Sequence, residues 1–339
     1  MKAVQVLGGG RVAVVDRPEP VARPGEVVVR VMASALCGSE RHGYEGQPRA
    51  SPSGSAAGNG GHEASGVVEA VGAQGAVSPG DRVLVFSTGH CGRCRYCRQG
   101  RWILCQHKPA GGTGMHAELI AVSEDRCIPV PDDLAFEDAA LLADAFGTPY
   151  HAMRRLGVSP ADTVLVVGQG PVGMAAAILA GLAGAAVVVA DVDERRLRRA
   201  SELGAVVTVD PRRDDLVEAV RSVAGAEGAD VALECSASPA GAAACLEAVA
   251  PGGRIAFIGL NREVTIDVTP ELILRDLTVV GSWYSDPADV AALVRLCGRG
   301  LEPGRLITHR FGLADAPHAF ATFFAGGDAA KVILEPGRP

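Results

Sequence analysis

The sequence predicts an α/β protein of two domains, a β-rich domain followed by a doubly wound parallel sheet. Its 339 residues exceed what one hydrophobic core usually covers. Short β-branched segments fill residues 1 to about 135, and strands alternate with helices from residue 146 onward. Hydrophobic residues make up 48% and charged residues 21%, and no run of eighteen apolar residues occurs. We therefore expect a globular protein without a membrane span.

The first domain is predicted over residues 1–145. The opening "MKAVQVLGGGRVAVV" lacks a continuous apolar core and a small-residue cleavage site, so we expect a β-hairpin, not a signal peptide, and a cytoplasmic protein. The segments "EVVVRVMASAL", "SGVVEAVG", "DRVLVF" and "HAELIAV" predict closely spaced strands of a barrel or sandwich. Residues 43–61 are rich in Gly, Ser and Pro and predict an irregular loop.

The second domain is predicted over residues 146–284. "TVLVVG", "AAVVVAD", "ADVALEC", "GRIAFIG" and "LTVVGSW" read as strands, separated by helical stretches such as "DERRLRRASELG". This alternation predicts a parallel sheet covered on both faces. Residues 285–339 contain a helix, the strand-like "RLITHRF", a short helix and "KVILEP". They are too few for a separate domain, so we expect them to rejoin the first one.

A dinucleotide site is predicted where the first strand of the second domain meets its helix. "GQGPVG" places Gly168, Gly170 and Gly173 in a G-x-G-x-x-G pattern, with Pro171 and Val172 between the last two glycines. The pattern follows an apolar strand and opens a helix, whose free N–H groups bind a pyrophosphate. The alternative is a purely structural turn.

Asp191 ends the next strand, twenty-three residues after Gly168. A carboxylate there accepts hydrogen bonds from ribose hydroxyls and repels a 2′-phosphate, which favours NAD over NADP. Arg195 and Arg196 follow closely and could soften this preference.

A metal site is predicted in "CGRCRYCRQGRWILC", residues 91–105. The spacing of Cys91, Cys94, Cys97 and Cys105 suits one tetrahedral zinc, and a site closed by four thiolates is structural, since catalytic zinc keeps an open position. The alternative is four reduced thiols without metal. The formal net charge of −7 argues against a nucleic-acid surface around such a zinc loop.

A second set of polar residues lies in "ALCGSERHGY" and "GGHEASG". Cys37, Ser39 and His42 follow one apolar strand, and His62 and Glu63 follow the glycine-rich loop. Taken singly, a buried Cys or a loop His is more often structural than functional.

Together, these motifs resemble those of the zinc-dependent medium-chain alcohol dehydrogenase family, closest to its polyol and sugar branch. "CGSERH", "GHEASGVVEAVG", the four-cysteine lobe and "GQGPVG" occur in that family's order over essentially the whole chain. The resemblance implies an α/β fold with a GroES-like β-barrel catalytic domain and a doubly wound Rossmann domain. It also implies two zinc ions per chain and NAD.

The resemblance also implies roles for single residues. Cys37 and His62 would bind the catalytic zinc, with Asp144 of "LLADAFGTPYHAM" as the third ligand and Glu63 as an alternative fourth. Glu40 would orient the zinc-bound histidine. Lys331 would reach the coenzyme pyrophosphate, with a solvated lysine as the alternative. Catalytic zinc would lower the pKa of the bound alcohol before hydride leaves it, while Ser39 passes the hydroxyl proton through the nicotinamide ribose to His42.

The implied substrate is a secondary alcohol of polyol, sugar or amino-cyclitol type, oxidised to a ketone. Threonine-type amino alcohols and simple secondary alcohols remain open, as do, more remotely, a zinc-free quinone or enoyl reductase and a non-enzymatic zinc scaffold. Nucleic-acid and membrane partners are not expected. Strand "LTVVGSW" should lie at a sheet edge and pair with its copy in a homodimer or homotetramer.

Overall fold

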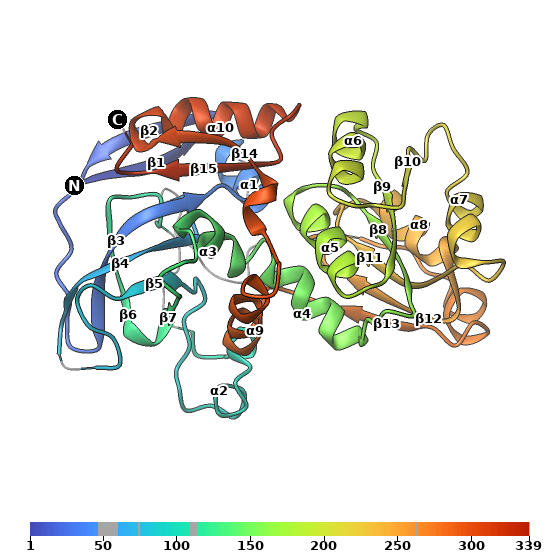
Figure 1. The fold of residues 1–339 in the computed structure, drawn as a ribbon, viewed down its shortest axis with the longest axis horizontal. Helices are drawn as coiled ribbons and strands as arrows, with labels where there is room; N and C mark the ends of the chain where they lie inside the picture. Colours follow the sequence, from blue (N-terminus) through green and yellow to red (C-terminus); the bar gives the residue numbers. More distant parts are fainter. Residues whose placement is uncertain (47–59, 74, 109–113, 262, 339) are drawn as a thin grey trace. The chain divides into compact units, whose positions relative to one another are not determined.

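The computed structural model describes residues 1–46, 60–73, 75–108, 114–261 and 263–338 (Figure 1). Most of the predicted loop 43–61 therefore lies outside the described residues. The chain divides into two compact units, which are described separately. The first comprises residues 1–144 and 285–339, and the second comprises residues 145–284. Within the described ranges, no helix has the length and apolar character needed to cross a bilayer.

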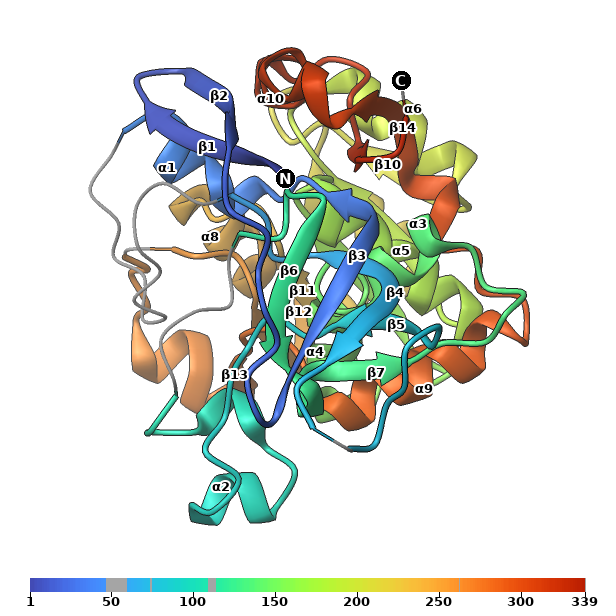
Figure 2. The same ribbon diagram turned by 90° about the vertical axis from the view of Figure 1, so that its left-hand side faces the viewer.

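The first unit is built on a mixed sheet in the order β14-β15-β3-β4-β5-β7, with β6 also paired to β3. Figure 2 shows β3, β4, β5, β6 and β7 side by side. The predicted N-terminal hairpin is present as the antiparallel pair β1–β2. The strands are β1 (Lys2–Gly8), β2 (Arg11–Asp16), β3 (Glu26–Ala35), β4 (Ala64–Val71), β5 (Arg82–Val85), β6 (Leu119–Ser123), β7 (Cys127–Pro129), β14 (Ile307–Gly312) and β15 (Lys331–Glu335). The helices are α1 (Arg41–Tyr44), α2 (Arg95–Arg98), α3 (Phe136–Leu142), α9 (Pro287–Cys297) and α10 (Ala316–Ala325).

The central strand β3 explains how this unit is held together. Its four valines are β-branched and all buried, which suits a strand with neighbours on both sides. It pairs antiparallel with β4, β6 and the C-terminal strand β15. An apolar cluster that includes Val4, Leu36 and Phe320 packs the C-terminal segment against the first residues of the chain.

The second unit contains a parallel sheet in the order β10-β9-β8-β11-β12-β13. The strands are β8 (Thr163–Val167), β9 (Ala186–Ala190), β10 (Val207–Val209), β11 (Ala229–Glu234), β12 (Val249–Phe257) and β13 (Thr278–Gly281). The helices are α4 (Gly147–Leu156), α5 (Pro171–Leu182), α6 (Glu194–Glu202), α7 (Leu216–Ala224) and α8 (Pro239–Ala248).

The order of these strands reverses between β8 and β11. From β8 the chain proceeds outward through β9 to β10, and from β11 it proceeds in the opposite direction to β13. Right-handed crossovers then place helices on both faces, and ligands of such sheets bind at the carboxyl ends of the strands beside the reversal. Strand β13 lies at the edge of the sheet, as predicted for the segment "LTVVGSW".

Candidate active site and metal centres

The pairing of β3 with β4 brings two of the predicted ligands together. Ser34 near the end of β3 lies opposite Ala64 at the start of β4, and the Ala35 N–H donates to the Glu63 carbonyl over 2.9 Å. Cys37 follows the end of one strand, and His62 precedes the start of the other. The antiparallel pairing of β3 and β4 therefore brings together Cys37 and His62, which are twenty-five residues apart in the sequence.

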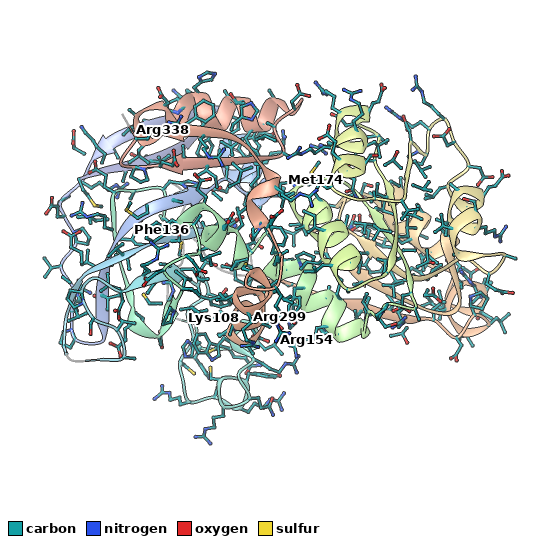
Figure 3. All side chains as sticks on the ribbon, viewed as in Figure 1. Lys108, Phe136, Arg154, Met174, Arg299 and Arg338 are labelled. Carbon is teal, nitrogen blue, oxygen red and sulfur yellow. The ribbon has the colours of Figure 1, made fainter. Side chains whose placement is uncertain are left out.

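Helix α3 positions the third predicted ligand. Its first residue, Phe136 (labelled in Figure 3), accepts a hydrogen bond from Ser65 Oγ at its carbonyl, and the Arg82 guanidinium lies 3.9 Å from its ring centroid. These contacts attach the helix to β4 and β5. Asp144 follows the end of α3 by two residues and is 7% exposed. The helix thus places Asp144 in the protein interior.

The three predicted ligands converge. The His62 Nε2 atom lies 2.9 Å from Asp144 Oδ2, and the Cys37 thiol lies 3.4 Å from the same oxygen. One ligand atom from each of Cys37, His62, Glu63 and Asp144 lies within 4.8 Å of the others. Sulfur, imidazole nitrogen and carboxylate oxygen are the ligand types that zinc takes in proteins. The donor set therefore fits a zinc ion.

The electrostatics of this cluster are those of a cation site. Burial, and then the negative charge of Asp144, raise the pKa of the Cys37 thiol. Burial opposes protonation of His62, but the nearby Cys37 and Asp144 outweigh it and raise the His62 pKa well above its ordinary value. A divalent cation would relieve both effects, because it stabilises the thiolate and binds neutral imidazole.

Glu63 and Lys331 form a completely buried ion pair beside the cluster. Lys331 Nζ lies 2.7 Å from Glu63 Oε1, and both side chains are 0% exposed. Burial raises the pKa of Glu63 to about 7, although Lys331 opposes this shift. The second oxygen, Oε2, is buried without a hydrogen-bond partner among the described residues, which suits an atom that can approach a metal. A contact between Lys331 and the coenzyme pyrophosphate stays a prediction.

The two predicted relay residues lie on the short segment after Cys37. Ser39 Oγ donates to Cys37 Sγ over 3.4 Å, so its hydroxyl is next to the ligand cluster. His42 is half-buried in α1. Glu40 differs from its expected role, because the hydrogen bonds of its carboxylate go to His116 and to backbone N–H groups and not to the His62 ring.

The four cysteines of residues 91–105 gather in a separate lobe around α2. Cys97 Sγ lies 3.4 Å from Cys94 Sγ and 3.9 Å from Cys91 Sγ, and all four sulfurs lie within 4.8 Å of one another. The backbone N–H groups of Cys91 and His107 both donate to Cys105 Sγ over 3.4 Å. Hydrogen bonds from backbone N–H groups, first that of Arg93, lower the pKa of Cys91 to about 6. The lobe therefore fits a closed four-thiolate zinc site.

The glycine-rich loop of the second unit has the geometry that a dinucleotide requires. Gly168 has a φ of +92°, and a Cβ there would lie 2.5 Å from Ser236 N. A Cβ on Gly173 would lie 1.8 Å from the Gly168 carbonyl oxygen. Gly170 is the N-cap of α5 and Pro171 its first residue, with Val172 next. The free N–H groups of α5 therefore face the carboxyl end of β8.

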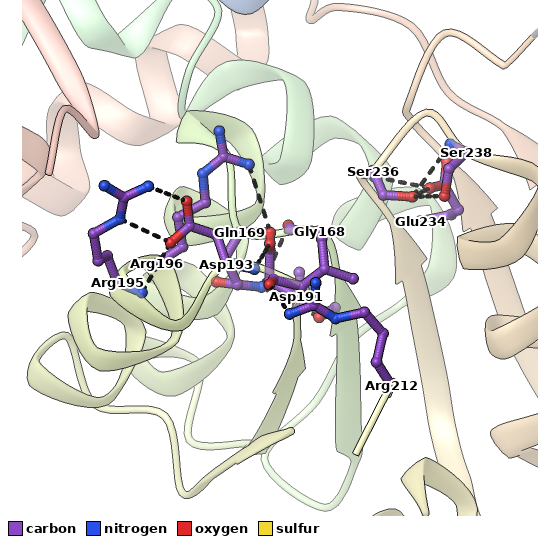
Figure 4. A network of polar contacts seen from close by, with 12 residues as sticks. Gly168, Gln169, Asp191, Asp193, Arg195, Arg196, Arg212, Glu234, Ser236 and Ser238 are labelled. Atoms are coloured by element: carbon purple, nitrogen blue, oxygen red, sulfur yellow. Dashed lines mark hydrogen bonds and ion pairs between the residues drawn. The ribbon is translucent and has the colours of Figure 1, made fainter. Parts of the chain in front are cut away.

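Asp191 is held rigidly at the end of β9 (Figure 4). Its carboxylate accepts hydrogen bonds from Gln169 N over 2.6 Å and from Asp193 N over 2.8 Å, and Arg196 lies 3.7 Å away. Asp191 thus connects the end of β9 to the glycine-rich loop. Arg212 reaches the Val192 carbonyl and pairs with Asp210, so it fixes the same turn from β10.

Sequence reasoning missed two buried polar residues near these sites. Glu234 ends β11 and accepts hydrogen bonds from Ser236 N over 2.7 Å and Asn261 Nδ2 over 2.7 Å, beside Gly168. His116 is 0% exposed and contacts both Ser34 and Glu40. The segment "HAELIAV" predicts only a strand, and the histidine that precedes its apolar residues is the one signal for a buried polar group there.

Comparison with protein families gives two matches. Residues 23–132 match the model described as alcohol dehydrogenase GroES-like domain, and residues 171–299 match the model described as zinc-binding dehydrogenase. The first match lies within the β-rich unit, and the second covers most of the parallel-sheet unit and continues through α9.

Curated relatives match the chain over nearly its full length. An uncharacterized zinc-type alcohol dehydrogenase-like protein of Escherichia coli is 34% identical, covering 98% of both chains. A sorbitol dehydrogenase of Halalkalibacterium halodurans is 31% identical over 97% of both chains. An L-threonine 3-dehydrogenase of Symbiobacterium thermophilum is 33% identical, covering 99% of this chain and 98% of its own.

Solved structures agree with these relatives. Alcohol dehydrogenase TADH from Thermus sp. ATN1 superposes with a TM-score of 0.89 at 32% identity over 99% of both chains. These matches confirm the α/β fold class with a GroES-like domain and a doubly wound Rossmann domain. The chain belongs to the zinc-dependent medium-chain alcohol dehydrogenase family, as the order of its motifs predicted, and is an oxidoreductase of that family.

Proposed function

We propose that this protein is an NAD-linked dehydrogenase that oxidises a secondary alcohol on a polyol, sugar or amino-cyclitol skeleton to the ketone. The observation that carries the proposal is the convergence of Cys37, His62 and Asp144 in one buried cluster. A third ligand that is a carboxylate follows the polyol pattern that the sequence resembles. The full-length match to a sorbitol dehydrogenase supports the same substrate class.

The chain's own residues can then be given roles. Zinc held by Cys37, His62 and Asp144 would polarise an alcohol hydroxyl and lower its pKa. Two anionic ligands and one neutral imidazole leave a zinc centre without net charge, and Lys331 cancels the charge of Glu63 beside it. The site would therefore hold a neutral polyol without excess negative charge.

Proton removal falls to the segment after Cys37. The Ser39 hydroxyl, 3.4 Å from Cys37 Sγ, is placed to accept the proton of a hydroxyl bound at the cluster. We assign His42 to its release toward solvent, because His42 follows Ser39 by three residues and is half-buried on α1. NAD bound at the loop of Gly168, Gly170 and Gly173 would accept the hydride. A cytoplasmic setting would keep the cysteine ligands reduced.

An activity screen tests this function. The purified full-length protein should bind two zinc ions per chain by elemental analysis and produce NADH with members of a panel of sugars, polyols and amino-cyclitols. Finding one zinc or none would remove the catalytic-zinc assignment. Two bound zinc ions and bound NAD without NADH production across the panel would instead contradict the proposed substrate class.

A threonine-type amino alcohol is the second candidate substrate. The full-length match to an L-threonine 3-dehydrogenase at 33% identity favours it. Adding L-threonine to the panel distinguishes the two, because an amino-alcohol enzyme should prefer L-threonine to every polyol by kcat/KM.

Replacing Asp191 tests the coenzyme assignment. Asp191→Gly should raise the KM for NAD by about 10–100-fold, because a hydrogen bond to a charged group contributes about 1.5–3 kcal/mol. The KM for NADP should change far less, since the lost carboxylate also repels a 2′-phosphate. Steady-state kinetics with both coenzymes measure this, and Glu194→Gln, an exposed change on α6, is the control. Equal effects on both coenzymes would contradict the assignment.

The edge strand β13 predicts self-association. Strand β13 ends the sheet order, and the exposed apolar residues Ile273 and Leu274 precede it. We expect a homodimer or homotetramer in which this edge meets its copy. Leu274→Glu should weaken association at least tenfold in light scattering, because burying such a side chain contributes about 1.5–3 kcal/mol. Leu182→Glu on α5 is the control, and a monomeric wild type would refute the prediction.

A further inference from the structure

One carboxylate connects the two segments that carry Cys37 and His62. Glu40 is 8% exposed, and its Oε2 accepts the Cys37 N–H over 3.0 Å. Its Oε1 accepts the Gly61 N–H over 2.7 Å. Gly61 directly precedes His62, so the two oxygens of Glu40 bridge the backbones of both ligand-bearing segments.

His116 holds this carboxylate from the other side. Its Nε2 lies 3.3 Å from each oxygen of Glu40, and its Nδ1 lies 2.5 Å from Ser34 Oγ. The ring is completely buried and packs edge-on against Phe320, with 5.7 Å between centroids. Ser34 lies on β3, so the ring connects Glu40 to the central strand of the unit.

The backbone around His116 is packed against the same segment. The His116 N–H donates to the Gly60 carbonyl over 3.3 Å, and the Met115 N–H donates to the Gly61 carbonyl over 3.2 Å. A Cβ on Gly60 would lie 3.1 Å from the His116 ring and 3.2 Å from Glu40 Oε1. A Cβ on Gly61 would lie 2.5 Å from His116 N. The two glycines therefore allow the His62 segment to lie directly on the Glu40–His116 pair.

We propose that Glu40 and His116 form a buried positioning pair that sets the distance between the Cys37 and His62 segments before metal binds. The pair acts on the backbone of the ligand segments and not on the His62 ring. A bridge that fixes both segments lowers the ordering cost of metal binding, as outer-shell contacts of metal sites do. The inference rests on the proposed metal centre of Cys37, His62 and Asp144.

Disrupting the pair should weaken the binding of the zinc ion at Cys37, His62 and Asp144 and leave the zinc of the four-cysteine lobe unaffected. Glu40→Gln replaces one acceptor oxygen by a donor, so it cannot accept both backbone N–H groups. His116→Phe keeps a ring against Phe320 but removes both contacts to polar side chains. Each variant should release one zinc about 10–100-fold more readily to a competing chelator, the range found for outer-shell changes. The zinc of the four-cysteine lobe should be retained as in the wild type.

The experiment measures zinc release from the full-length protein with a chromophoric chelator. Cobalt substitution adds a spectroscopic readout, because the d–d bands of cobalt bound by Cys37, His62 and Asp144 report the ligand geometry at that site. Glu69→Gln on β4 is the matched control, since Glu69 is an exposed partner of Arg30 far from these contacts in the sheet register. The zinc retained in the lobe and the far-UV circular dichroism spectrum establish that each variant is folded, and His116→Gln serves if His116→Phe does not fold.

The possible outcomes separate the pair from the proposed metal centre. A wild type with two zinc ions, one of them released faster in Glu40→Gln and His116→Phe with shifted cobalt bands, supports the pair. Unchanged release and unchanged bands in both variants overturn it, while the metal centre stands. A wild type that binds zinc only in the lobe overturns the metal centre and the pair together.

Discussion

Asp144→Ala is expected to remove one of two zinc ions and to lower kcat/KM at least about a thousandfold, because Lewis-acid stabilisation by a metal contributes several kcal/mol. Asp144 Oδ2 lies 2.9 Å from His62 Nε2 and 3.4 Å from Cys37 Sγ. Alanine supplies no ligand atom there, so the zinc would keep only two of its three proposed ligands. Elemental analysis should find one zinc per chain, and NAD-linked kinetics should show the loss of turnover.

The second zinc and the fold should survive this change. The four cysteines of residues 91–105 lie in a separate cluster and do not depend on Asp144. Asp132→Ala is the matched control, because the Asp132 side chain is fully exposed and follows β7 in the same unit. It should leave both zinc ions and turnover unchanged. Activity that persists in Asp144→Ala would show that another residue, Glu63 first among them, completes the ligand set.

Local patterns in the sequence predicted the glycine-rich loop and the four-cysteine lobe, because the residues that form each of them lie close together in the sequence. The spacing of Gly168, Gly170 and Gly173 after an apolar strand requires one geometry, and the structure has it. The four cysteines lie within fifteen residues, so their convergence needs only one short lobe. Strand β13 at the sheet edge follows from the strand order of a doubly wound sheet.

Contacts between distant segments were not available from the sequence. His116 meets Glu40 across seventy-six residues, and the sequence offers no period or spacing that connects them. The same holds for Lys331, which the resemblance assigned to the coenzyme but which the structure pairs with Glu63 across 268 residues. Both pairs depend on pairing between strands that lie far apart in the chain, β3 with β4 and β15 with β3, and local sequence patterns do not show which distant strands pair. The cluster of Cys37, His62 and Asp144 could be predicted only because the family resemblance assigned all three residues to one zinc ion.

Lys331→Met is expected to destabilise the protein by about 3–5 kcal/mol, because it leaves the buried Glu63 charge without its partner. Methionine preserves the length and apolar body of the side chain, so the effect isolates the ammonium group. The thermal unfolding temperature should fall by roughly 10 °C, given the usual 2–4 °C per kcal/mol for units of this size. Glu63→Gln combined with Lys331→Met should recover most of the loss, since the double variant buries no unpaired charge.

The pH dependence of this loss distinguishes an ion pair from simple packing. Burial raises the folded-state pKa of Glu63 to about 7, above the ordinary value of about 4.3 for an unfolded chain. A raised carboxyl pKa favours the folded state at low pH, and that contribution is lost as pH rises through the folded-state value. Removing Lys331 makes the ionised form costlier still, so the deficit of Lys331→Met should be largest above about pH 7 and shrink as pH falls toward 5. A deficit of equal size at every pH would indicate packing alone. Unchanged stability with a raised KM for NAD would instead place Lys331 at the coenzyme, as the resemblance implies.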